Sequence, residues 1–513
     1  MAADFDVIVI GSGIGGLSCA AALAQLKRKI LVLEQHNIAG GLTQTFSRDG
    51  YTWDVGVHYL GQMGPGEQAK RVLDWLSGRA IKMASMGAIY DTIRFPENFE
   101  LSFSRPAHAL KLDLKEAFPE SSYEIDRFFA ILTEAAKSAE VPFMLRAMPR
   151  KVGSAVAFWK RKSIAKWWAR TTEQVLSEII SDKKLRAVLS AQWGDYGGKP
   201  CEASFGLHAL IINHYLGGAY YPVGGAQVFA NTLIPQIEAA GGAVRVNSPV
   251  ASILVEAGNA VGVCLEDGSE YRASRVVSDI GARNTVNCLL RDNLRVTSWA
   301  SDVMALKPSI CHVALYLGFE GDIHAAGATR SNVWIYETWD PNSAIWQDPF
   351  AEPTAPMLFV SFPSLKDPAH GGGHNAKHTG EVIAWVNWEA FSQWADSSYG
   401  ARPEEYRLFK DVVVQNILAQ FKRHFPALSP MIRYHELSTP LSTLHFTRAV
   451  QGAIYGLETT PRRFLSRCLD IRTPIPGLYL AGQDPITPGV TGAMMGGVLA
   501  AAAIDSRVFL KIR

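Results

Sequence analysis

The stretch from Phe5 to Glu34 constrains the fold more than any other part of this chain of 513 residues. It begins with an apolar, β-branched run, Val7-Ile8-Val9-Ile10, which is typical of a fully buried parallel strand. A GxGxxG pattern follows at once, and apolar residues at helical spacing lead into a second apolar run. This order predicts a strand–turn–helix–strand unit. Its glycines allow a tight turn, close approach of the backbone to a pyrophosphate, and close helix–strand packing.

Glu34 ends the second apolar run of this unit. An acid at that place, about twenty residues after the glycines, accepts hydrogen bonds from a ribose diol and disfavours a 2′-phosphate. The phosphates are expected at the helix N-terminus, where free N–H groups and the helix dipole attract anions. We therefore predict a site for the ADP part of NAD or FAD. The unit supplies Gly11, Ser12, Gly13, Ile14, Gly15, Gly16, Glu34 and Gln35 to it.

Two further patterns favour FAD. A second glycine pair, in Gly40-Gly41-Leu42-Thr43, allows another close approach to a dinucleotide. Near the C-terminal end, residues 477–480 predict a short buried strand that leads through Gly482 to the acid Asp484. A glycine-rich stretch with Thr491 and Gly492 then opens an Ala-rich helix. In these motifs the chain resembles the FAD-dependent amine oxidase and phytoene desaturase superfamily.

The resemblance implies roles for single residues. It implies that Asp484 binds the ribityl chain and that the helix entry at Thr491 and Gly492 points at the flavin pyrimidine. It also implies that the backbone of Val250 holds the adenine. The family's second motif usually reads Gly-Gly-Arg, but Leu42 replaces the Arg here, which argues against a close amine oxidase relationship.

The fold implied by the resemblance is α/β. A Rossmann-type FAD-binding domain of the glutathione-reductase-like kind is interleaved with an α+β substrate domain. We assign residues 1–70, 225–295 and 441–513 to the FAD-binding domain, and residues 71–224 and 296–440 to the substrate domain. Alternation and turn residues further predict a hairpin over 89–102 and a single strand over 272–278.

A narrower resemblance extends over most of the chain. Residues 54–59, 192–197 and 221–225 resemble retinol saturases and carotenoid isomerases. In the shared fold the first of these segments runs beside the isoalloxazine, so His58 and Tyr59 are the expected catalytic residues. The alternative is that His58 only packs against the flavin, because many flavoenzymes transfer hydride without a dedicated base.

Composition bounds the function classes. The formal charge is +2 and 48% of residues are apolar, so we expect an ordinary globular protein that does not bind nucleic acid. Six scattered cysteines without a CxxC pair predict reduced thiols rather than a disulfide framework or zinc site. His208 and His214 are expected to be structural or substrate-lining, since no cysteine or acid completes a ligand set. We expect no signal peptide and no membrane-spanning segment.

Residues 146–172 combine cations with aromatic side chains and contain no acid. The cations are Arg146, Arg150, Lys151, Lys160, Arg161, Lys162, Lys166 and Arg170, and the aromatics are Phe158, Trp159, Trp167 and Trp168. Such a stretch suits a helix in a membrane interface. The alternative is a solvated face whose tryptophans pack on the core. We expect a cytoplasmic protein, peripherally associated with a membrane, whose oligomeric state stays open.

With one dinucleotide fingerprint, no Ser-His-Asp set and no metal-ligand spacing, the cofactor is expected to carry the chemistry. We predict an FAD-dependent oxidoreductase acting on CH–CH bonds. It would transfer hydride between flavin N5 and a carbon–carbon bond of a long hydrophobic lipid, as a carotenoid or retinoid saturase, desaturase or isomerase. NAD(P)H, docked transiently, is one candidate electron donor. A desaturase of fatty-acyl chains in membrane lipids and a non-catalytic prenyl- or lipid-binding escort protein are the alternatives, and an amine oxidase is disfavoured.

Overall fold

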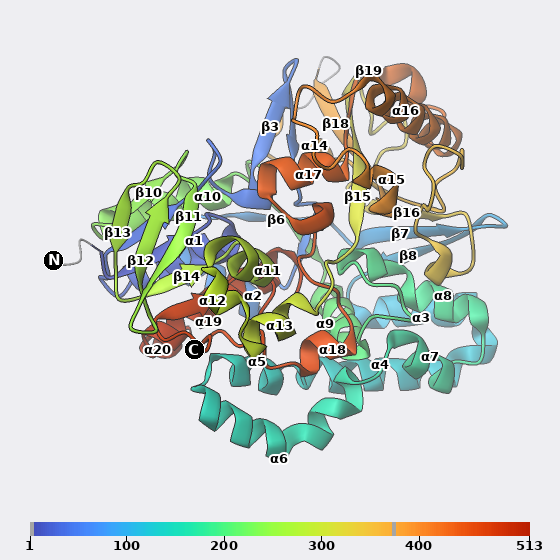
Figure 1. Ribbon diagram of the computed structural model, residues 1–513. Coiled ribbons are helices and arrows are strands. Elements are labelled where there is room, and N and C mark those ends of the chain that lie inside the picture. Colours follow the sequence, from blue (N-terminus) through green and yellow to red (C-terminus); the bar gives the residue numbers. More distant parts are fainter. Residues whose placement is uncertain (1–4, 372–375, 513) are drawn as a thin grey trace.

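The computed structural model describes residues 5–371 and 376–512 of the chain, and two sheets form its centre (Figure 1). One sheet is parallel, with strand order β10-β2-β1-β14-β20. Its strands are β1 (Val7–Ile10), β2 (Ile30–Leu33), β10 (Ala243–Arg245), β14 (Val276–Ser278) and β20 (Leu478–Leu480). They all come from the segments predicted to form the nucleotide domain.

The parallel sheet is buried on both faces, which explains why its strands read as continuous apolar runs. Val7 and Val9 of β1 pack against helices α1 (Ile14–Ala24), α2 (Gln68–Ser77), α10 (Val228–Ala239) and α19 (Gly489–Ile504). Ile8 and Ile10 point to the opposite face. An antiparallel sheet of β11 (Val250–Glu256), β12 (Asn259–Leu265) and β13 (Glu270–Arg272) covers that face together with α13 (Ser298–Met304).

Helices α1 and α19 touch along glycines. A Cβ on Gly497 would overlap the carbonyl oxygen of Gly15, and one on Gly496 would overlap that of Gly482. These glycines in the middle of α19 are therefore needed for packing. The contact fixes the N-terminus of α1 against the middle of α19.

The second sheet is mixed, with order β19-β15-β18-β17-β16-β7-β8. Its strands are β7 (Ile89–Phe95), β8 (Phe99–Ser104), β15 (Cys311–Glu320), β16 (Asn332–Tyr336), β17 (Met357–Ser361), β18 (Lys377–Val386) and β19 (Ile432–Ser438). Side chains alternate between two cores, as the period of a strand requires. Ala314 and Tyr316 face one core, and Val313, Leu315 and Leu317 face the other.

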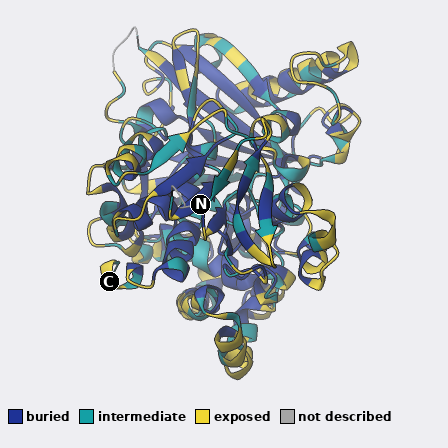
Figure 2. Cartoon of the chain, turned by 60° about the vertical axis from the view of Figure 1, so that its left-hand side comes forward, coloured by how far each residue is buried: buried dark blue, intermediate teal, exposed yellow. Residues whose placement is uncertain are grey.

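Helices complete both cores of the mixed sheet. One face is covered by α3 (Ala107–Ala117), α4 (Ser122–Lys137), α7 (Thr172–Ile179), α8 (Lys183–Ser190) and α9 (Phe205–Tyr215), and the other by α16 (Glu404–His424). Exposed residues gather on the outer helices and loops, while the strands of the mixed sheet are largely buried (Figure 2). Within the described ranges, no helix is both long and apolar enough to cross a membrane.

The predicted hairpin over 89–102 is confirmed, since β7 pairs with β8. The single strand predicted over 272–278 is wrong. The chain leaves the antiparallel sheet after Arg272 and enters the parallel sheet at Val276, so the segment is divided between two sheets. A local pattern cannot reveal this change of sheet, because both parts are extended and only three residues separate them.

Candidate functional site

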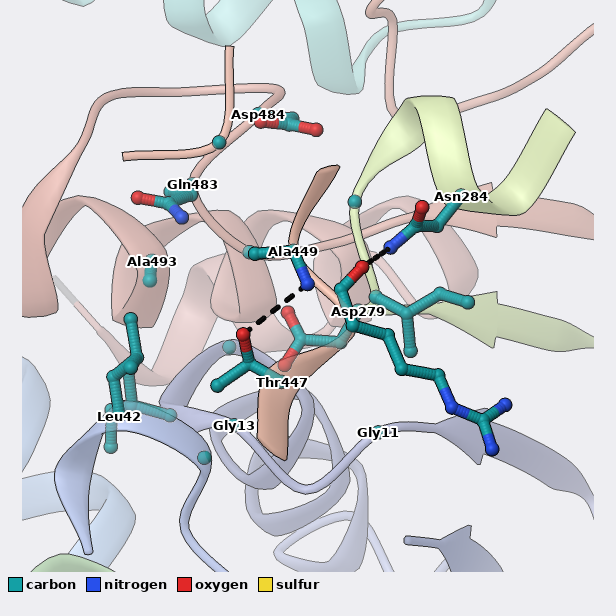
Figure 3. Close-up of a pocket in the computed structure, with 18 of the residues that line it drawn as sticks. Gly11, Gly13, Leu42, Asp279, Asn284, Thr447, Ala449, Gln483, Asp484 and Ala493 are labelled. Atoms are coloured by element: carbon teal, nitrogen blue, oxygen red, sulfur yellow. Dashed lines mark hydrogen bonds between the residues drawn. The ribbon is translucent and has the colours of Figure 1, made fainter. Parts of the chain in front are cut away.

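A cavity of about 360 Å³ lies beside the N-termini of both α1 and α19 (Figure 3). The glycine loop after β1, the second glycine pair and the loop after β20 form part of its wall. Segments 279–284 and 446–457 complete it, and two hydrogen bonds brace them. Asn284 Nδ2 donates to the carbonyl oxygen of Arg448 at 2.8 Å, and the Ala449 amide donates to Thr447 Oγ1 at 3.3 Å (Figure 3).

Most residues predicted to bind the cofactor line this cavity. These are Gly11, Gly13, Ile14, Gly15, Glu34, Gln35, Gly41, Leu42, Thr43, Val250, Gly482 and Asp484. The other predicted residues do not line the cavity: Ser12, Gly16, Gly40, Thr491 and Gly492. Ser12 supports the wall, since its amide and hydroxyl donate to Glu34 Oε2 at 2.9 and 2.6 Å.

The two glycine motifs pack against each other. A Cβ on Gly41 would come within 3.0 Å of the Gly13 Cα atom, and Gly41 has a φ of +56°. Any larger residue there would push the loops apart. The second glycine pair thus closes the cavity by direct contact with the first.

Glu34 and Asp484 each present a partly anchored carboxylate to the cavity. Glu34 Oε1 accepts the His36 amide at 2.8 Å, and its Oε2 holds Ser12. Asp484 Oδ2 accepts the Ala282 amide at 2.7 Å. Its buried Oδ1 has no hydrogen-bond partner within the described residues. A buried acceptor without a donor is costly, so a ligand hydroxyl is expected to fill this place.

Asp279 is a third carboxyl at the cavity, and the sequence did not predict it. It follows β14, and its Oδ2 accepts the Gly16 amide at 2.7 Å in the first turn of α1. Burial, with a smaller contribution from Glu34 and Asp484, raises the pKa of Asp279 to about 8. At neutral pH this carboxyl is therefore largely protonated, which reduces its repulsion of an anion at the helix N-terminus.

These residues fit FAD. Gly13 and Gly15 leave backbone exposed at the positive end of α1, where a pyrophosphate is stabilised. The unpartnered Asp484 Oδ1 suits a ribityl hydroxyl, and a Cβ on Gly456 would overlap that oxygen. Helix α19 begins at Gly489 on the cavity wall, so its N-terminal dipole is available to the ring system.

A cluster of polar groups lies beside the mixed sheet and is named the acid–tyrosine cluster: Tyr59, Asp91, Gln192 and Asp195. Tyr59 Oη lies 3.0 Å from Asp91 Oδ2 and 2.7 Å from Asp195 Oδ2. A phenol carries one proton, so one of these contacts requires a protonated carboxyl.

The hydrogen bonds show which carboxyl holds the proton. Burial raises the pKa of Asp91, but Asp91 also accepts from Gln192 Nε2 at 2.5 Å and from Asn332 Nδ2 at 3.0 Å, and these bonds oppose that shift, so Asp91 is the better stabilised anion of the two. Asp195 has the phenol as its partner, and burial together with the charge of Asp91 raises its pKa well above the ordinary value. The protonated Asp195 carboxyl therefore donates a hydrogen bond to Tyr59 Oη, and the Tyr59 hydroxyl donates one to the Asp91 carboxylate.

Tyr455 connects the cluster to the cavity. It lines the cavity, and its ring packs against Gly197, where a Cβ would overlap it. Burial raises the pKa of the Tyr455 phenol. Asp195 is only half-buried, while Tyr59, Asp91 and Gln192 are buried. The proton-bearing group is thus the most accessible member of the cluster.

His58, the other predicted catalytic residue, does not line the cavity. Its Nδ1 lies 2.8 Å from Glu381 Oε2, and its carbonyl oxygen accepts from Lys366 Nζ at 2.9 Å. Burial, and then Lys366, lowers the pKa of His58 to about 3. His58 is therefore neutral at physiological pH, and its catalytic role stays a prediction.

His208 and His214 have structural partners. His208 Nδ1 lies 3.0 Å from the Tyr196 hydroxyl, and His214 Nε2 accepts the Gly61 amide at 2.9 Å. Within the described residues, no group of three His, Cys, Asp or Glu side chains could hold a metal ion.

Comparison with known proteins places this geometry among flavoproteins. The family model described as flavin containing amine oxidoreductase matches residues 14–505. All-trans-retinol 13,14-reductase of Danio rerio is 32% identical over 98% of this chain and 86% of its own length. Prolycopene isomerase of Arabidopsis thaliana is 25% identical over 99% and 84%. A putrescine oxidase variant of known structure is 17% identical, covers 98% of this chain and 99% of its own, and superposes with a TM-score of 0.67.

Proposed function

Because the chain belongs to the flavin-containing amine oxidoreductase family, we propose that it transfers hydride between FAD and a carbon–carbon bond of a long hydrophobic lipid. Relatives named for retinol reduction and for prolycopene isomerisation support a polyene substrate. The observation that carries the proposal is the proton-bearing Asp195, which is bonded to Tyr59 and lies two residues before Gly197, where the cavity-lining Tyr455 packs. Bound FAD supplies the hydride-transfer chemistry.

The chain's own residues supply binding and a proton. A double bond that becomes saturated takes up one hydride and one proton, and Asp195 is the proposed donor of that proton. Water that reaches the half-buried Asp195 can then return a proton to it, and the Tyr59 hydroxyl holds the Asp195 carboxyl in place by its hydrogen bond. Apolar side chains of the cavity wall, among them Leu42 and Ile454, offer a surface to a polyene substrate. A hydrocarbon substrate binds such a wall without a charged anchor, at about 0.8 kcal/mol per buried methylene.

Saturation is the direction that this arrangement favours, because the accessible acid is protonated. Desaturation of an acyl chain would instead require the same group to accept a proton. A nicotinamide donor such as NADPH is part of the proposal, since saturation consumes electrons that the substrate does not supply.

The purified holoenzyme tests the proposal by anaerobic absorbance spectroscopy. Bleaching of the flavin bands by NADPH, followed by their recovery when a polyene is added, is expected. Bleaching by the lipid itself would reverse the direction to desaturation. A protein purified without flavin absorbance would point to a lipid-binding escort instead.

A further inference from the structure

Helix α6 (Arg150–Trp168) is the lowest element in Figures 1 and 2 and projects from the body of the protein. Only one side of it is packed. Trp168 lies 5.0 Å, between ring centroids, from Phe464 of α18 (Pro461–Leu465), and 5.4 Å from Phe143 of α5 (Glu140–Ala147). Trp167 packs on Phe205 of α9. These contacts hold the helix at its C-terminal end.

The aromatic side chains of α6 divide into two groups. Trp167 and Trp168 are buried, as expected if tryptophans pack on the core. Phe158 and Trp159 are 63% and 85% exposed, and Val152 is 52% exposed. Val152 and Trp159 lie at i and i+7 positions, beside a stripe of Lys151, Phe158 and Lys162. The outer face therefore mixes large apolar groups with cations.

The cations of this outer face lack acidic neighbours. Lys166 and Arg170, near the packed end, pair with Glu134 and Glu178. Within the part of the chain that the structure describes, no ion pair joins a carboxylate to Lys151, Lys160, Arg161 or Lys162. Arg161 instead lies over the Phe158 ring, 4.2 Å from its centroid. The projecting part of the helix is thus an uncompensated positive surface.

We propose that the outer face of α6 docks the protein on membranes that contain anionic phospholipids. Trp159, Phe158 and Val152 enter the boundary between head groups and acyl chains, and the surrounding cations contact lipid phosphates and carboxylates. Charge complementarity selects this occupant. A nucleic acid fits less well, because the aliphatic Val152 next to Trp159 offers no stacking surface and the whole chain carries a formal charge of only +2.

The base of α6 is tied to the cavity wall. Arg146 of α5 is buried, and its guanidinium donates to the carbonyl oxygens of Pro485 at 2.6 Å and Arg463 at 2.9 Å. Pro485 follows Asp484, and Arg463 in turn donates to the Gln483 carbonyl oxygen at 2.7 Å. Through Arg146, the segment that leads into α6 is therefore connected to the loop after β20. That docking helps a lipid substrate to reach the cavity rests on the proposed function, but the docking itself does not.

Vesicle flotation of the holoenzyme tests the docking. Binding is expected to phosphatidylcholine vesicles with about 30 mol% phosphatidylserine, but not to pure phosphatidylcholine, and to weaken as salt rises from about 0.1 to about 0.5 M. The variant K151Q/K162Q is expected to bind about 30-fold more weakly, which corresponds to about 1 kcal/mol per cation. K27Q/K29Q, which changes two exposed lysines of the nucleotide domain, serves as the matched control and should bind like the wild type.

Insertion of the aromatic groups has its own readout. Brominated acyl chains are expected to quench tryptophan fluorescence in the wild type, and less in W159F. Equal vesicle binding by K151Q/K162Q and the wild type would overturn the proposal, as would displacement of the vesicles by inorganic phosphate or a preference for RNA. Flavin absorbance and NADPH bleaching, measured without vesicles, show independently whether the proposed reaction holds.

Discussion

Replacing Asp279 with Asn is expected to remove a pH dependence from FAD binding. The Asp279 carboxyl caps the Gly16 amide at the N-terminus of α1, and burial raises its pKa to about 8. The ionised form would stand beside the FAD pyrophosphate, whereas the protonated form keeps a carbonyl acceptor for Gly16 without adding charge. FAD is therefore expected to bind the protonated form.

The magnitude follows from this pKa. If FAD binds only the protonated form, the apparent Kd rises as one plus ten to the power of pH minus pKa. With a pKa of about 8, the factor that multiplies the Kd is close to one at pH 7 and about eleven at pH 9. The affinity for FAD therefore falls about tenfold from pH 7 to pH 9. The sign is fixed: affinity is full below pH 8 and is lost above it.

Equilibrium dialysis of apoprotein against FAD between pH 6 and pH 9 measures this change. Asp279→Asn should bind FAD with nearly constant affinity over the range, because the amide accepts from Gly16 and does not titrate. Asp267→Asn, at an exposed turn, serves as the control and should keep the wild-type slope. A tenfold fall that persists in Asp279→Asn would refute the assignment, because Glu381 and Lys366, whose pKa values also lie at about 8, would then be responsible.

Three further changes test other parts of the structure. Glu34→Ala should lower the affinity for FAD about tenfold or more, since a hydrogen bond to a charged group contributes about 1.5–3 kcal/mol. Full occupancy of the variant by FAD, measured by absorbance, would show that the ribose lies elsewhere. Gly497→Ala should lower the free energy of unfolding, measured with urea, by about 3 kcal/mol or prevent folding, because the added Cβ overlaps the Gly15 carbonyl oxygen. The control Gly371→Ala, with open space around the added Cβ, should leave the urea midpoint unchanged. Tyr59→Phe should slow turnover about 100-fold or more with unchanged NADPH bleaching, since it removes the hydrogen bond that holds the proton-donating Asp195. Tyr90→Phe, whose hydroxyl has no partner within the described residues, is the control, and equal rates would remove Tyr59 from the mechanism.

Local patterns allowed prediction of the parts of the site that are contiguous in sequence. The glycine loop, Glu34 and the loop of Asp484 each follow a strand whose apolar run marks it. Asp279 could not be found in this way, because it meets Gly16 through pairing of β14 with β1 across 263 positions. The acid–tyrosine cluster is similar, since Tyr59 and Asp195 are 136 positions apart and lie on different elements. One sequence pattern indicates this cluster: residues 54–59 and 192–197, which contain Tyr59 and Asp195, resemble segments of retinol saturases and carotenoid isomerases.

The charge pattern of the cavity finally argues for a ligand with hydroxyl groups at two places and an anion between them. Glu34 and Asp484 are anchored acceptors on separate loops, and each suits a ligand hydroxyl. Between them lie the N-terminus of α1 and Asp279, whose raised pKa removes its charge at neutral pH. A ligand with only phosphate would leave Asp484 Oδ1 without a donor, and one with only hydroxyl groups would make no use of the helix dipole. A ribose, a pyrophosphate and a ribityl chain in sequence satisfy all three places, which is the order of groups in FAD.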